Sequence, residues 1–167
     1  MSANKQRWLK LIHVLSVCLW LGGGFSLGSL HYLRFSPESV AGALFGLDKA
    51  ASHIDLFIVI ISGAVPCLLT GLIYSIFTNW GFFKHRWVTV KWILTLVCII
   101  TGTFLLGPLE KQMVTMSHAL GDAALLTPDY EIARRTHFIF GNVQRALLIF
   151  MLFLSFFKPW KKKNALP

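Results

Sequence analysis

The chain has 167 residues, of which 55% are hydrophobic, and its formal net charge is +9. This composition excludes an ordinary soluble domain and a disordered chain, and it is typical of a small protein with several membrane spans. The lysines and arginines are concentrated beside the apolar runs, which indicates orientation in a lipid bilayer and argues against nucleic-acid binding. The three cysteines lie inside apolar runs, so they do not form a secreted disulfide framework.

Four apolar runs are each long enough to cross a bilayer as a helix. The sequence therefore predicts an all-α, integral membrane four-helix bundle that forms a single membrane domain over residues 1–167. The expected spans cover residues of about 8–33, 54–77, 88–107 and 137–157.

Prolines mark the ends and bends of these runs. Pro66 predicts a kink within the second span, because proline removes a backbone hydrogen bond inside a helix. After Gly107-Pro108, an outer helical segment is expected at about 109–120. Thr127-Pro128-Asp129 has the composition of a helix start, with Thr127 as the side-chain cap and Pro128 at the first position. The fourth helix is therefore expected to begin outside the membrane.

Basic and acidic residues separate along the chain. Ten of the sixteen lysines and arginines lie before or at the start of the first span, between the second span and the start of the third, or after the fourth. All seven acidic residues fall on the other side or at its boundary. Because basic residues favour the cytoplasmic side of a bilayer, both termini are predicted to be cytoplasmic. We expect a multi-pass protein of a bacterial cytoplasmic (inner) membrane.

This topology divides the six histidines, with His13 and His85 on the cytoplasmic side and four on the outer side. A single interfacial histidine is more often structural than a ligand, but four at one face of so small a protein favour a heme or metal site. We expect at least two of three histidines to ligate one heme iron, and His137 is the first choice among them: His31, His53 and His137. His118 is a weaker candidate.

Glycines accompany two of these histidines. Gly141 follows His137 by four residues, and Gly24 and Gly28 precede His31 on its helix. Such glycines either clear space for the edge of a porphyrin or form a small-xxx-small contact between helices, and the sequence leaves both readings open.

Arg145 lies about 12 Å inside the fourth span, counted from His137 along an α-helix. A charge at this depth is costly, so it is a candidate for function. Arg145 is expected to bind a heme propionate, pair with Asp55, reach a water-filled cavity or hold helices together. Arg134 and Arg135 are further candidates for neutralising propionates.

A second metal site is conceivable on the outer helical segment. Met113, Met116 and His118 combine thioether and imidazole groups, which suit Cu(I). Two methionines and a histidine also occur by chance on amphipathic helices, so this set is the alternative to the heme site.

Short motifs are distributed over the four spans: His13-x6-Trp20-Leu21-Gly22-Gly23, Thr70-Gly71-Leu72, Trp87-x3-Lys91, and Phe140-x-Asn142 with Lys158-Pro159-Trp160. The first three resemble motifs of the CopD-like copper-resistance membrane proteins and the related HemJ-type protoporphyrinogen oxidases, which contain heme. The last resembles the final helix of the HemJ type. The resemblance implies heme or copper binding, with His13 and Lys91 as site residues. Ser29 and Thr89 stand where the HemJ type has an arginine and a histidine.

The function predicted from the sequence is a membrane-embedded b-type heme redox protein. Such an oxidoreductase of electron transport would pass electrons between a membrane donor such as quinol and an acceptor on the outer side. The alternatives are a CopD-like copper-binding or copper-transport protein and a cofactor-free membrane subunit of a larger complex. The predicted cofactor is heme b, with copper as the alternative. The expected partners are the bilayer, quinone, and further copies of the chain or other membrane subunits.

Overall fold

The structure is a computed structural model that describes residues 2–34, 42–77 and 86–158. These residues are helical almost throughout, which confirms the predicted all-α class. The helices are α1 (Ala3–Leu33), α3 (Leu44–His53), η1 (Ile54–Ala64), α4 (Val65–Phe77), α5 (Arg86–Thr101), η2 (Gly102–Leu106), α6 (Gly107–Leu120), η3 (Gly121–Leu126) and α7 (Pro128–Phe157). They form four continuous stretches long and apolar enough to cross a membrane: Ala3–Leu33, Leu44–Phe77, Arg86–Leu126 and Pro128–Phe157.

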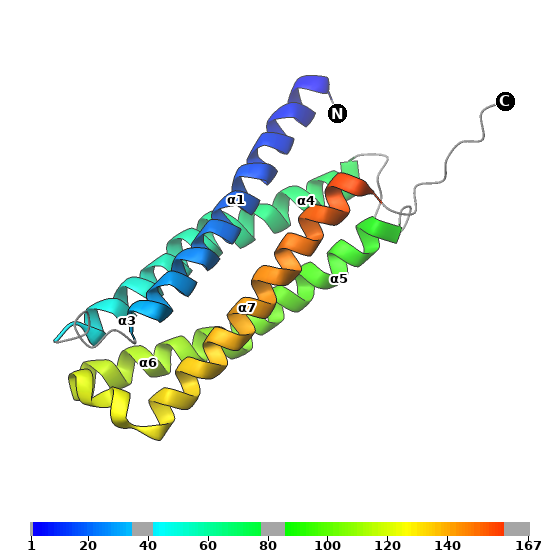
Figure 1. Cartoon of the computed structure of the whole chain (residues 1–167). Coiled ribbons are helices and arrows are strands. Elements are labelled where there is room, and N and C mark those ends of the chain that lie inside the picture. Colours follow the sequence, from blue (N-terminus) through cyan, green and yellow to red (C-terminus); the bar gives the residue numbers. More distant parts are fainter. Residues whose placement is uncertain (1, 35–41, 78–85, 159–167) are drawn as a thin grey trace.

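The four stretches lie side by side, with α1 beginning and α7 ending at the same end of the bundle (Figure 1). We call this the inner end, because the charge distribution predicts that it faces the cytoplasm. The opposite, outer end is formed by α3, α6 and η3 (Figure 1). The expected outer segment at about 109–120 falls on α6.

Two wide π-helical segments interrupt the long helices, and each one ends two residues before a proline. In η1 the Val65 amide donates to the carbonyl of Ile60, and in η2 the Gly107 amide donates to the carbonyl of Gly102, both five residues back. A proline ring crowds the carbonyl one turn earlier in an α-helix, so the preceding turn widens before Pro66 and Pro108. The sequence predicted a bend at these sites but not this form of it.

The last helix begins with Pro128 at its first position, as its sequence predicts. Thr127 has the extended backbone of a residue that precedes a helix, with φ −89° and ψ 133°. Its hydroxyl does not cap α7, because it donates to the carbonyl of Ala124 at 2.6 Å and so closes the turn from η3 instead. The predicted side-chain cap is therefore wrong, although the helix start is right.

Two glycines bring α1 and η1 into close contact. A Cβ atom on Gly63 would lie 2.8 Å from backbone atoms of Trp20, and one on Gly23 would lie 2.6 Å from Val59. Only hydrogen in place of a side chain permits this approach. Trp20 and Val59 then join a central apolar cluster with Cys98, Leu148 and Met151. The contact fixes the distance between two of the helices that form the pocket described next.

Candidate functional site

A pocket in the outer half of the bundle is lined by α1, η1, η2 and α7. Its polar lining consists of five side chains: His31, Asp55, His137, Gln144 and Arg145. The cavity volume is about 40 Å³, which accommodates a few water molecules. This outer pocket therefore combines two imidazoles, a carboxyl, an amide and a guanidinium inside a membrane protein.

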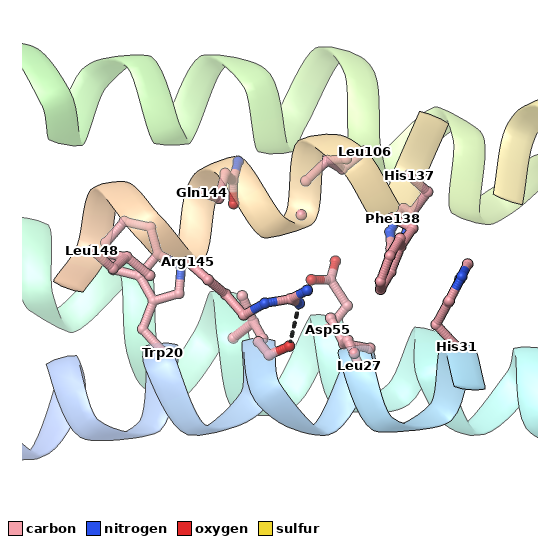
Figure 2. A pocket seen from close by; sticks show the side chains of 14 residues that line it. Trp20, Leu27, His31, Asp55, Leu106, His137, Phe138, Gln144, Arg145 and Leu148 are labelled. Carbon is pink, nitrogen blue, oxygen red and sulfur yellow. Dashed lines mark hydrogen bonds between the residues drawn. The ribbon is translucent and has the colours of Figure 1, made fainter. Parts of the chain in front are cut away.

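The structure brings together two of the predicted histidines. Figure 2 shows His31 on α1 and His137 on α7 at facing sides of the outer pocket. His31 is 6% exposed, and the ring of Phe138 stacks on its imidazole at a centroid distance of 3.8 Å. Phe138 therefore covers one face of the imidazole. It does not block the two ring nitrogens, which point outward in the plane of the ring.

The other two outer histidines lie elsewhere. His53 is exposed at the end of α3, where its Nδ1 is 3.0 Å from the carbonyl of Lys49 and its ring lies beside Phe57. His118 is exposed on α6 and packs against Phe45. Neither residue lines the outer pocket.

Arg145 crosses the outer pocket from α7 to α1. Its Nη1 donates to the carbonyl of Gly24 at 2.7 Å (dashed in Figure 2), and its Nη2 donates to the side chain of Asn142. A Cβ on Gly28 would lie 3.2 Å from Nη1, and one on Gly24 would lie 3.3 Å from the Arg145 side chain. Gly24 and Gly28 therefore make room for the arginine. Asp55 lines the same pocket, but the ion pairs among the described residues do not join it to Arg145.

The donor set of the outer pocket fits a heme. Two imidazoles on different helices could hold the iron of a heme, and an arginine in the same cavity could pair with a propionate. The free space is smaller than a porphyrin, and the guanidinium of Arg145 occupies the gap beside Gly24 and Gly28. A porphyrin would therefore require the side chains that line the cavity, Arg145 among them, to move apart.

The three residues of the copper alternative lie in two different environments. Met113 is buried in an apolar cluster with Leu44 and Tyr130, and Met116 packs against the same cluster. His118 instead points to the exposed side of α6. Among the described residues, no three His, Cys, Asp or Glu side chains are grouped so that they could hold a metal ion.

A second polar cluster lies in the inner half of the bundle, and its residues belong to the motifs noted above. His13 Nδ1 lies 2.8 Å from the hydroxyl of Thr70, and the His13 ring borders Gly71. Lys91 lies near His13 and donates to Ser155 at 2.7 Å. Residues from α1, α4, α5 and α7 thus converge on one inner cluster.

The bonds of Thr70 determine which nitrogen of His13 carries the proton. The Thr70 hydroxyl donates its proton to the carbonyl of Pro66 at 2.6 Å, so it can only accept from His13. His13 therefore donates from Nδ1, and in the neutral ring Nε2 is the nitrogen that has a lone pair. A hydrogen bond on one nitrogen commonly prepares the other for ligation or proton acceptance.

The outer end contains a buried ion pair that the sequence analysis missed. Arg34 and Asp48 form a salt bridge at 2.8 Å, with side chains 3% and 0% exposed. The hydroxyl of Tyr130 donates to the Asp48 carboxylate at 3.0 Å. The sequence pattern that indicates burial of Asp48 lies in α3, where Asp48 shares one helix face with Leu44 and Ala51. All three residues are buried in the structure.

The comparisons with known proteins bear on the fold rather than on either polar cluster. No curated protein and no solved structure matches this chain. The model of one protein family matches residues 7–159, which is nearly the whole chain and covers all four membrane stretches except the first residues of α1. The chain is therefore a multi-pass membrane protein, and it belongs to the family described as predicted integral membrane protein (DUF2269).

Proposed function

We propose that this protein is a membrane redox protein and that His31 and His137 would hold a heme b in the outer pocket. The observation that supports it is that these two imidazoles line one cavity from different helices. Of the three ligand candidates, His53 is set aside because it lies outside this cavity. The proposed location is a bacterial cytoplasmic membrane, and the proposed electron donor is a membrane quinol.

When bound, the heme would supply one-electron transfer near the outer face of the membrane. The residues of the chain have separate tasks. His31 and His137 would bind the iron, and Phe138 holds the plane of His31 by stacking. Arg145, which donates to the Gly24 carbonyl, would be the partner of a propionate, and this pairing would compensate the cost of its charge inside the bilayer. Trp20 and Leu148, both buried, close the deep end of the pocket against water.

The inner cluster supports a second candidate function. His13, Thr70 and Lys91 come from three motifs that resemble CopD-like and HemJ-type proteins, and they lie together. In this alternative, heme or copper binds at the cytoplasmic half through Nε2 of His13. The outer pocket would then have a different ligand.

An absorption spectrum of the purified protein, expressed with an ample heme supply, separates these possibilities. A low-spin heme spectrum is expected for the wild type. His31→Ala and His137→Ala should each abolish it or convert it to high-spin, because one axial ligand is lost. The matched control is His53→Ala, an exposed outer histidine whose replacement should leave the spectrum unchanged.

Other results would contradict the outer site. If His31→Ala and His137→Ala keep a native low-spin spectrum while His13→Ala loses it, the heme belongs to the inner cluster. If the wild type contains no heme but stoichiometric copper, the copper alternative replaces the heme proposal. A folded protein without either would support the role of a cofactor-free subunit.

A further inference from the structure

Lys91 lies between two neighbouring helices at the inner end of the bundle. Its Nζ, from α5, donates to the hydroxyl of Ser155 on α7 at 2.7 Å. The Ser155 hydroxyl donates its own proton to the carbonyl of Met151 at 2.9 Å, so it can only accept from Lys91. The ring of the buried Trp87 lies beside Nζ, at a distance of 5.8 Å from its centroid. Two neutral side chains therefore hold the ammonium group in place.

The described helices bring no acidic side chain to this end of the bundle. α1, α4 and α5 contain no aspartate or glutamate, and the two acidic residues of α7, Asp129 and Glu131, lie in its first turn at the outer end. The ion pairs among the described residues lie at the outer end as well. A half-buried ammonium group is costly in a membrane protein unless an anion accompanies it. An anion from outside the chain would meet this need.

The position of Lys91 along the bundle matches the headgroup region of a bilayer. Lys91 is five residues, about 7.5 Å, from the first residue of α5, and Ser155 is two residues, about 3 Å, from the last residue of α7. These two helix ends lie side by side (Figure 1). Helical side chains lean toward the N-terminus of their helix, so Lys91 is directed toward the inner end. Arg86 and Lys158, at the adjoining helix ends, add positive charge there.

We propose that Lys91 binds the phosphate group of an anionic phospholipid, in the leaflet at the inner end, between α5 and α7. An ammonium group has three N–H donors, and Ser155 accepts from one of them, which leaves two for phosphate oxygens. Exposed apolar side chains of both helices, among them Ile93 and Phe156, give the acyl chains a surface to lie on. This apolar surface favours a lipid over free phosphate as the source of the anion. The inference requires no cofactor and does not rest on the heme proposal.

Native mass spectrometry of the full chain in detergent, titrated with phosphatidylglycerol or phosphatidylcholine, tests the site. The wild type is expected to bind one phosphatidylglycerol more tightly than phosphatidylcholine, whose phosphate is balanced by its own cation. Lys91→Met should weaken this binding by about tenfold to a hundredfold, the range of a hydrogen bond to a charged group. Lys91→Arg keeps the charge and should retain the binding. The matched control is Lys10→Met, an exposed lysine near the inner end of α1, which should cost no more than about fivefold.

Three results would contradict the proposal. Equal losses in Lys91→Met and Lys10→Met would show that the lipid is attracted by surface charge in general. A wild type that binds phosphatidylcholine as tightly as phosphatidylglycerol would overturn the site, whether or not any variant folds. Inorganic phosphate at the same concentration should leave the lipid bound. If it displaces the lipid from the wild type, the ligand is a free anion and the lipid assignment is wrong.

Discussion

At the scale of single residues, Arg145 illustrates how a charge is accommodated inside a membrane bundle. The guanidinium binds a backbone carbonyl of α1 and the side chain of Asn142 on its own helix. The glycines beside it were predicted either to clear a cofactor edge or to pack helices. In the structure Gly24 and Gly28 instead leave the volume that the arginine fills. Arg145 therefore has two roles, because it lines the outer pocket and its hydrogen bond to Gly24 joins α7 to α1.

Replacing Arg145 by leucine tests this bond. Arg145→Leu should lower the free energy of unfolding by about 1 kcal/mol, a value in the range of hydrogen bonds between membrane helices. Thermal unfolding in detergent measures the change. The control is Arg135→Leu, whose side chain is 73% exposed and bonds to Glu131 on the same helix. An unchanged melting temperature for Arg145→Leu would mean that the arginine only reaches toward water and does not join the helices.

At the scale of helices, the contact between α1 and η1 depends on the absence of side chains at two positions. Gly63→Ala should destabilise the protein by about 1–3 kcal/mol, because the new Cβ would lie 2.8 Å from the backbone of Trp20. Thermal unfolding again provides the measurement. Gly22→Ala is the matched control, since a Cβ at Gly22 has no atom within 4 Å. Equal stability of the two variants would show that α1 and η1 can separate without cost.

Helix positions were largely predictable from the sequence, whereas helix contacts were not. Run length and hydrophobicity locate the four stretches, because a bilayer admits few other backbone structures. The exact glycines in contact depend on rotation of each helix, which a uniformly apolar run does not specify. Gly23 and Gly63 form the contact between α1 and η1. Gly24 and Gly28, which have the small-xxx-small spacing, lie against Arg145 instead. The π-helical turns before Pro66 and Pro108 likewise depend on backbone geometry.

At the scale of the whole molecule, the predicted orientation can be tested by labelling. Leu126→Cys, at an 88% exposed position in η3, should react with a membrane-impermeant thiol reagent added outside intact cells. Lys5→Cys, near the start of α1, should react only after the membrane is opened. The expectation follows from the concentration of basic residues at the inner end. Labelling of Lys5→Cys in intact cells would reverse the orientation and place the outer pocket on the cytoplasmic side.

The candidate site was predictable only in part. Topology grouped His31, His53 and His137 at one end, but it could not determine which imidazoles turn inward. His53 faces away because its position on α3 is on the exposed side, a matter of rotation about the helix axis. The hydrogen bond from Arg145 to the carbonyl of Gly24 joins residues 121 positions apart, and no local pattern connects them. Contacts of this kind arise only when the helices have packed.

The ion pair of Arg34 and Asp48 has a consequence for how the protein is made. Both residues emerge from the ribosome early, but the hydroxyl that Tyr130 donates to Asp48 belongs to a residue 82 positions further along the chain. Synthesis proceeds from the N-terminus, so a nascent or truncated chain carries Asp48 without this donor. In such a chain Asp48 has Arg34 as a partner but lacks the hydrogen bond from Tyr130. Completion of the last helix is therefore the step of synthesis that supplies the missing hydrogen bond to Asp48.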